Sequence, residues 1–258
     1  MVAMNRFNFT EKTVLITGGS MGIGETFASE LSKRGARLIL VARSESRLRA
    51  VADRLQNTEI IVEDLAKPGA ALRVFEAVRA KNLTVDVLIN NAGFATYGPF
   101  AEVSRETQRE EVDLNIGALV ELTHLFLPML EARQGGVIQV ASTAGFQPVP
   151  FMAVYSASKA FVLNFSEALW AEYRPRGVRV LALCPGATDT PFFARAGEAA
   201  AFGKKARAED VVSLGLRAFD ANRSFVIHGT QNYFTAMLAR FVPRALVALI
   251  SARLMRPR

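Results

Sequence analysis

The 258 residues are half hydrophobic, which is enough to bury a large core within a single α/β domain. The single cysteine, Cys184, excludes a disulfide framework within the chain, and we expect a buried, inert thiol in a reducing, cytoplasmic compartment. Residues 1–10 lack the apolar core of a signal peptide, and no stretch approaches the ~18 uncharged residues of a membrane span. We therefore expect a soluble or peripheral protein.

The net charge of +7 is compatible with nucleic acid, an anionic membrane surface or acidic small molecules as partners. This charge is unevenly distributed, because no acidic residue follows Asp220. Six arginines do follow it: Arg223, Arg240, Arg244, Arg253, Arg256 and Arg258. Basicity is concentrated in the C-terminal tail, and we predict no nucleic-acid partner.

Short apolar runs alternate with segments of helical periodicity along the chain. We expect strands at 13–17, 37–42, 59–62, 85–90, 136–141, 178–184 and 224–228, and helices at 25–34, 44–55, 69–81, 104–133, 153–173 and 208–220. Most strands are unbroken apolar runs, as in parallel sheets covered on both faces. The pattern predicts an α/β fold with a doubly wound parallel sheet of about seven strands, whose ligands lie at the carboxyl ends of the strands. We assign residues 1–230 to one domain and 231–258 to a C-terminal helical extension.

The first strand runs into a glycine-rich turn, 17–24, that leads into a helix. Glycines there would let the backbone approach a pyrophosphate, which the N–H groups at the start of the helix would bind. The spacing G-x-x-x-G-x-G differs from the common G-x-G-x-x-G, and such turns also arise for structural reasons alone. Its place after the first strand favours a dinucleotide site formed by Gly18, Ser20, Met21, Gly22, Ile23 and Gly24.

The second expected strand ends at Ala42 and Arg43, where an acidic residue would bind the two ribose hydroxyls of NAD. Arg43 can instead pair with a 2′-phosphate and stack on adenine, with Ser20 as a second donor. We predict a preference for NADP(H). The alternative is that Arg43 is a solvated loop residue.

Tyr155 and Lys159 are four residues apart in the expected helix 153–173, so both side chains project from one face. A nearby ammonium would lower the phenol pKa from its reference value of about 10, so that tyrosine could act as acid or base. Such a pair is often only a solvated helix face. Ser142, just past the expected strand 136–141, adds weight to a catalytic interpretation.

The chain resembles the classical short-chain dehydrogenase/reductase family. The matching residues follow the family's order: 17–24, Asp64, Asn90, Asn91, Ala92, Gly93, Asn115, Ser142, 155–159, Pro185, Gly186 and Thr190. They extend over most of the domain. The resemblance implies a Rossmann-like fold and an NADP(H)-dependent oxidoreductase.

The resemblance also implies residue roles. Tyr155 would transfer the proton, Lys159 would lower its pKa and hold the nicotinamide ribose, and Ser142 would bind the substrate oxygen. Asn115 would hold a water that relays protons to Lys159. Further cofactor contacts are implied for Asp64, Leu65, Asn91, Ala92, Gly93, Pro185, Gly186, Thr188 and Thr190, the alternatives being turn, cap or solvent-facing residues.

The loops expected around the substrate are rich in apolar residues: Phe94, Tyr97, Phe100, Phe146, Val149, Phe151, Met152, Phe192, Phe193 and Phe202. We expect half of these residues to touch substrate. The predicted substrate-binding residues are Ser142, Phe94, Phe146, Phe151 and Phe192. This lining would suit a bulky apolar carbonyl or alcohol. The Ala- and Gly-rich segment 187–206 matches a mobile substrate loop of the family. No metal site is expected, since neither His124 nor His228 has ligand-spaced cysteines or carboxylates.

Between Tyr233 and Met255 we expect two short amphipathic helices broken at Pro243. With the arginines beside them, these helices could lie on an anionic membrane surface. Packing on the domain or on a partner subunit is the favoured interpretation.

The leading hypothesis is a reductase or reversible dehydrogenase for a hydrophobic ketone, aldehyde or secondary alcohol. A 3-oxoacyl-thioester reductase is the enzymatic alternative. The alternative from another class is an NADP(H)-binding regulator or membrane-surface adaptor. By resemblance we expect a homodimer or homotetramer, formed through the helices at 104–133 and 153–173.

Overall fold

The computed structural model describes residues 7–197 and 203–257, which form a seven-stranded parallel sheet. The strands are β1 (Thr13–Thr17), β2 (Arg37–Ala42), β3 (Thr58–Val62), β4 (Val87–Asn90), β5 (Gly136–Val140), β6 (Arg179–Cys184) and β7 (Phe225–Ile227). Their order is β3-β2-β1-β4-β5-β6-β7, and each neighbouring pair is parallel. The predicted doubly wound sheet is confirmed. Strands β2 and β3 extend the sheet on one side of β1, and β4 to β7 extend it on the other. This change in the order of the strands lies between β1 and β4, and a crevice for ligand is expected there.

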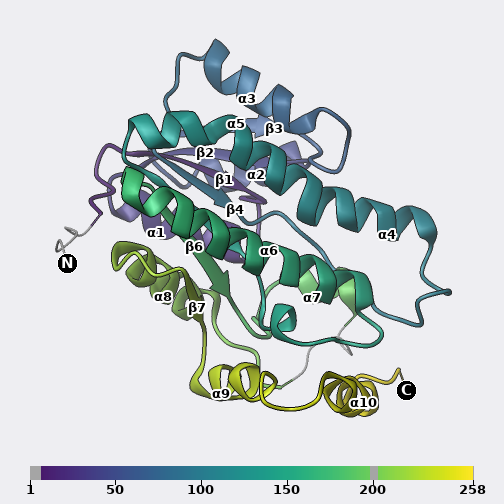
Figure 1. Cartoon of the computed structure of the whole chain (residues 1–258). Coiled ribbons are helices and arrows are strands. Elements are labelled where there is room, and N and C mark those ends of the chain that lie inside the picture. The colour runs from purple at the N-terminus through teal and green to yellow at the C-terminus, as the bar shows by residue number, and fades with distance from the viewer. Residues whose placement is uncertain (1–6, 198–202, 258) are drawn as a thin grey trace.

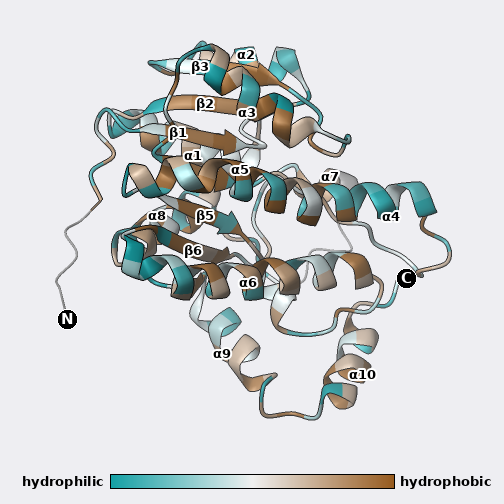
Figure 2. Cartoon of the chain, turned by 45° about the horizontal axis from the view of Figure 1, so that its top comes forward, coloured by the Kyte–Doolittle hydropathy of each residue, from teal (hydrophilic) through white to brown (hydrophobic). Residues whose placement is uncertain are grey.

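Helices cover both faces of the sheet (Figure 1). One face packs on α1 (Gly22–Lys33), α2 (Glu45–Ala52) and α8 (Ala208–Asp220), and the other on α3 (Ala70–Ala80), α5 (Leu119–Ala132) and α6 (Ala153–Tyr173). Neighbouring strand residues serve opposite faces: Ile16 packs toward α1, and Leu15 packs toward α3 and α5. The inner strands are mostly hydrophobic because both of their faces are buried, whereas the edge strand β3 is only partly buried (Figure 2).

The expected helix 104–133 contains a π-helical segment, Asp113–Ala118, between α4 (Arg105–Val112) and α5. Such π-turns are rare and often accompany functional sites. By length and composition this helix could also cross a membrane, which the sequence analysis did not anticipate. In the structure it covers the sheet, with Leu122, Phe126 and Leu130 buried in the core.

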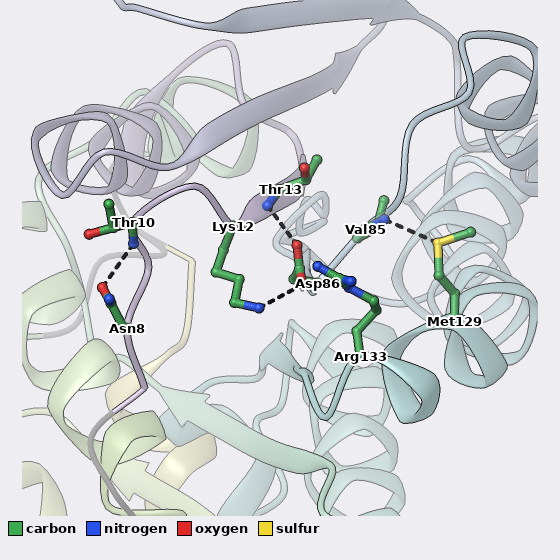
Figure 3. A network of polar contacts seen from close by, with 8 residues as sticks. All are labelled: Asn8, Thr10, Lys12, Thr13, Val85, Asp86, Met129 and Arg133. Atoms are coloured by element: carbon green, nitrogen blue, oxygen red, sulfur yellow. Dashed lines mark hydrogen bonds and ion pairs between the residues drawn. The ribbon is translucent and has the colours of Figure 1, made fainter.

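A polar network joins the amino ends of β1 and β4 (Figure 3). The buried Asp86 carboxylate accepts a 2.9 Å hydrogen bond from the Thr13 N–H and pairs with Lys12 and Arg133 at 3.1 and 3.0 Å. Next to it, the Val85 N–H contacts the sulfur of Met129. With Asp86 in this network, the β4 strand begins at Val87 rather than at Val85 as expected. The network lies at the opposite end of the strands from the crevice.

The C-terminal extension forms two helices, α9 (Thr230–Leu238) and α10 (Arg244–Leu254), separated at Pro243 as predicted. Figure 1 shows them in yellow, apart from the layers that cover the sheet. Their attachment to the domain includes buried Met255, whose carbonyl oxygen accepts a 2.9 Å hydrogen bond from the Tyr97 hydroxyl.

Candidate active site

A cavity of about 1420 Å³ opens along the carboxyl ends of the strands. Nearly all of the residues predicted to bind cofactor line it: Gly18, Ser20, Met21, Gly22, Ile23, Arg43, Asp64, Leu65, Asn91, Ala92, Gly93, Tyr155, Lys159, Pro185, Gly186, Thr188 and Thr190. Ser142 is part of the same wall. Gly24 and Asn115 are not among the lining residues. The fold therefore brings residues from most of the length of the chain together in one cavity.

The glycine turn between β1 and α1 has the geometry of an anion cradle. Gly18 and Gly22 have φ angles of +64° and +58°, a region that side chains rarely adopt. Helix α1 begins at Gly22, and Met21 before it makes no side-chain capping hydrogen bond. The first N–H groups of α1 therefore remain available to an anion at the cavity wall. These residues fit the pyrophosphate of a dinucleotide.

Asn91, just past β4, ties the glycine turn to the sheet. Its side-chain amide donates to the carbonyl oxygens of Thr17 and Gly18 at 2.9 and 3.2 Å. The Thr17 hydroxyl in turn accepts hydrogen bonds of 3.0 Å from the N–H groups of Asn91 and Ala92. Asn91 thus supports the turn through its side chain, and Ala92 and Gly93 continue the wall.

Arg43 is exposed at the cavity wall just past β2. Arg47 lines the same wall, and its guanidinium lies 4.0 Å from the sulfur of Met21 in the glycine turn. The sequence analysis missed Arg47, although its position in the first turns of the helix that follows Arg43 was an available signal. In the lining of the same cavity, the Asp64 carboxylate accepts a hydrogen bond from the Ala66 N–H, and Leu65 is buried.

Ser142 and Tyr155 are both buried in the cavity wall. Ser142 follows β5, and its hydroxyl accepts a 3.1 Å hydrogen bond from the Ala144 N–H. The next residue of this turn, Gly145, packs on α6 so closely that a methyl group there would lie 2.7 Å from the Lys159 carbonyl oxygen. This close approach brings the Ser142 turn against the helix that carries Tyr155.

The expected lowering of the Tyr155 pKa by Lys159 is not found. Burial raises the pKa of Tyr155 to about 12, only partly opposed by a hydrogen bond with Ser142, and the charge of Glu111 raises it further. Burial also lowers the pKa of Lys159 to about 8, against the charge of Glu111, which raises it. The Lys159 ammonium donates a 2.8 Å hydrogen bond to the Val140 carbonyl oxygen and lies 5.8 Å from the centre of the Tyr155 ring. Removal from water therefore outweighs the attraction between these two groups.

Asn115 is buried in the π-helical segment behind the cavity. Its amide donates to the Phe94 carbonyl oxygen at 2.9 Å and to the Ser158 hydroxyl at 3.1 Å, and its oxygen accepts from the Phe94 N–H. Both amide protons are thus used within the protein. A methyl group on Gly93 would lie 2.9 Å from the Asn115 side-chain oxygen and 3.5 Å from the Lys159 nitrogen. Asn115 accordingly lies close to Lys159, but its polar side chain is committed to holding the Phe94 loop and α6 together.

Glu111, one helical turn before Asn115, is a buried carboxylate that the sequence analysis did not single out. It accepts hydrogen bonds of 2.6 and 3.2 Å from the Thr96 hydroxyl and N–H. Its charge raises the pKa of both Tyr155 and Lys159. No local pattern distinguishes this glutamate from its solvated neighbours in the run Glu110-Glu111, so only the packed structure reveals it.

Half of the ten apolar loop residues line the cavity: Phe94, Val149, Met152, Phe192 and Phe193. The Phe192 ring lies 5.7 Å from that of Tyr155. Phe146 and Phe151, which were also expected to touch substrate, are not among the lining residues, and their substrate contacts stay predictions. Phe146 lies 6.0 Å from the Phe225 ring, and Phe151 packs on the apolar cluster that includes Tyr155 and Phe193.

The remaining three loop residues also lie elsewhere. Tyr97 binds Met255, and Phe100 is 66% exposed. Phe202 lies outside the described residues, as does part of the segment 187–206 expected to be mobile. Within the described part of that segment, Thr188 forms a β-bridge with Ala206, and Thr190 lies against Gly22 of the glycine turn.

The C-terminal helices supply the rest of the apolar wall: Leu238, Val242, Val247, Ile250, Leu254 and Met255. His228, for which no metal-ligating role is expected, also lines the cavity. Across the described ranges, no three His, Cys, Asp or Glu side chains gather as a metal site would require.

Comparison with known proteins identifies the protein family of this chain. The family model for short chain dehydrogenases matches residues 12–201. The chain therefore belongs to the short-chain dehydrogenase family, whose members are oxidoreductases that bind NAD(P)(H).

Curated relatives include hydroxysteroid dehydrogenase-like protein 1 of Gallus gallus, 35% identical over 66% of this chain and 54% of the relative. Very-long-chain 3-oxoacyl-CoA reductase of Anas platyrhynchos is 36% identical over 66% of this chain and 58% of the relative. The matched region thus spans little more than half of either relative. Among solved structures, a short-chain dehydrogenase from Sphingobium yanoikuyae in complex with NADPH is 34% identical, with a TM-score of 0.80, covering 89% of this chain and 94% of that one. A bulky-bulky ketone specific alcohol dehydrogenase from Comamonas testosteroni is 29% identical, with a TM-score of 0.75, covering 89% and 92%.

Proposed function

We propose that this protein is an NADPH-dependent reductase, or reversible dehydrogenase, for a hydrophobic ketone, aldehyde or secondary alcohol. The observation that carries the proposal is one cavity with two chemically different ends. Ser142 and Tyr155 share the lining with Phe94, Phe192 and the apolar C-terminal wall, and the same lining includes the glycine turn, Arg43 and Arg47.

In this proposal the substrate carbonyl oxygen accepts hydrogen bonds from the hydroxyls of Ser142 and Tyr155. With a pKa raised to about 12, Tyr155 is protonated at neutral pH and is ready to donate its proton to that oxygen. Lys159 is charged below pH 8 or so, and its ammonium stabilises the phenolate left behind. The bound nicotinamide supplies the hydride that completes reduction. The raised Tyr155 pKa favours the reductive direction, because oxidation requires this phenol to begin deprotonated.

The preference for NADPH rests on two guanidinium groups at the wall where the second strand ends. Arg43 and Arg47 can both approach an adenosine 2′-phosphate, whereas an acidic residue there would repel it. The NADPH complex of the Sphingobium yanoikuyae enzyme, 34% identical, supports the same choice.

A 3-oxoacyl-thioester reductase is a second candidate, supported by the avian very-long-chain 3-oxoacyl-CoA reductase and by the size of the cavity. The test is NADPH oxidation by the purified protein with hydrophobic ketones, aldehydes and 3-oxoacyl-coenzyme A thioesters. Turnover of simple ketones or aldehydes supports the leading proposal, and turnover of thioesters alone supports the second. Tight NADPH binding with no turnover of any compound would indicate the cofactor-binding regulator instead.

We also propose a homodimer or homotetramer assembled through α4, α5 and α6, which lie side by side on one face of the molecule (Figure 1). Val112 on α4 and Phe161 on α6 are exposed apolar side chains there, and Phe161 stacks on Phe165. Sedimentation velocity tests this assembly. The cytoplasmic location stays a proposal, supported by the single, buried Cys184.

A further inference from the structure

The hairpin formed by α9 and α10 carries two sets of apolar side chains, one that lines the cavity and one that does not. Its inner face contributes Leu238, Val247, Ile250 and Leu254 to the cavity. Its outer face presents side chains that do not line the main cavity: Phe234, Phe241, Leu246 and Leu249, which are 70%, 85%, 48% and 65% exposed. We call these four residues the outer apolar face. Exposed apolar surface gathered in one place marks a site for a partner or a membrane.

Exposed apolar surface is concentrated in this hairpin. Of the thirteen large apolar side chains that are exposed in the described part of the chain, eight lie between Tyr233 and Leu254. Figure 2 shows the hairpin at the edge of the molecule, on the side opposite α3. The surface is therefore accessible to a partner outside the domain.

The charged side chains that the hairpin itself carries are all arginines. Arg240, Arg244, Arg253 and Arg256 are exposed on or beside the two helices, and the sequence contains no acidic residue after Asp220. A second copy of the chain docked symmetrically on this face would bring arginines against arginines. Charge complementarity therefore favours an anionic partner.

Phe241 shows which anionic partner fits. It is the most exposed of the apolar side chains, and it lies in the link between the helices with Arg240 and Arg244 on either side. An aromatic ring flanked by arginines matches a lipid interface, where the ring enters the acyl boundary and the guanidinium groups remain at the headgroups.

We propose that the outer apolar face docks the protein on an anionic lipid bilayer. The arginines bind the headgroups, and Phe241, Leu246 and Leu249 enter the interface. Because the inner face of the same helices lines the cavity, docking holds the cavity wall against the membrane, where apolar molecules are dissolved.

The test is co-sedimentation of the full-length protein with vesicles of phosphatidylglycerol and phosphatidylcholine, compared with phosphatidylcholine alone. We expect binding to the anionic vesicles that weakens as salt is raised. The double variants Phe241→Ser/Leu249→Ser and Arg240→Glu/Arg244→Glu should each reduce this binding by about 10-fold or more. None of these four residues lines the cavity, so NADPH affinity should remain at the wild-type value.

Matched controls lie on other surfaces. Leu72→Ser removes a side chain of α3 that is 48% exposed, and Arg105→Glu reverses a charge on α4. Both should sediment with vesicles as the wild type does. The proposal is overturned if anionic vesicles do not bind the protein, or if the outer-face variants bind as well as these controls. It is also overturned if the wild type forms an oligomer that the outer-face variants disrupt, since the occupant would then be a second copy.

Discussion

Gly24 of α1 packs directly against the carbonyl oxygen of Gly18 at the end of β1, leaving no room for a side chain between helix and strand. A methyl group on Gly24 would also lie 2.6 Å from the Asn91 side-chain nitrogen that holds the turn. This contact places the amino end of α1 at the cavity wall. The anion cradle therefore depends on a residue that does not line the cavity.

Gly24→Ala should weaken NADPH binding by about 10-fold or more, because the glycine turn must open to admit the methyl group. Gly117→Ala is the matched control, since nothing lies within 4 Å of a methyl group there. Fluorescence titration with NADPH measures both variants. An unchanged dissociation constant in Gly24→Ala would show that the turn does not hold the cofactor.

Arg43→Asp should raise the NADPH dissociation constant by about 10- to 100-fold and leave NADH binding unchanged or improved, because a carboxylate repels the 2′-phosphate. Arg47→Ala should weaken NADPH binding in the same direction. Arg37→Asp, an exposed charge at the other end of β2, serves as the control. Equal losses for NADPH and NADH in Arg43→Asp would contradict the assigned preference.

The pH dependence of reduction should follow Lys159. Its pKa is lowered to about 8, so the ammonium is present below that pH and is lost as the pH rises through it. We expect kcat/KM for reduction to be level below pH 8 and to fall about tenfold per pH unit above it. Lys159→Arg, whose guanidinium stays charged, should remove this decline. A wild-type profile that is level to pH 10 would contradict the role given to Lys159.

Substitution of Asp86 tests how much the polar network at the amino ends of β1 and β4, away from the cavity, contributes to stability. Its carboxylate is buried between the Thr13 N–H, Lys12 and Arg133, so Asp86→Ala should lower the free energy of unfolding by about 2–4 kcal/mol. Glu45→Ala removes only an exposed pair with Arg49 and should cost less than about 1 kcal/mol. Urea denaturation measures both. Equal effects of the two substitutions would contradict the importance of burial here.

The glycine turn and Ser142 could be placed from sequence because each follows an apolar strand, and Tyr155 and Lys159 because their spacing puts them on one face of a helix. A parallel sheet brings such strand ends together, so local patterns are enough to gather the site. The helices 153–173 and 208–220 were placed with the bounds that the structure has.

Features decided by distant packing could not be predicted in this way. Phe146 and Phe192 are both aromatic residues of the segments expected to border the substrate, but only Phe192 lines the cavity, whereas Phe146 packs near the distant Phe225. The return of the tail to the cavity depends on contacts such as that between Tyr97 and Met255, 158 residues apart. The pKa of Tyr155 was predicted in the wrong direction because burial is a property of the complete fold.

The central claim is that Tyr155 transfers the proton in an NADPH-dependent reduction. The most direct measurement compares wild type with Tyr155→Phe for NADPH-dependent turnover of a hydrophobic ketone, together with the NADPH dissociation constant. We predict that turnover falls by about 100-fold or more, while the dissociation constant changes by less than about twofold. A Tyr155→Phe variant that retains wild-type turnover would contradict the account.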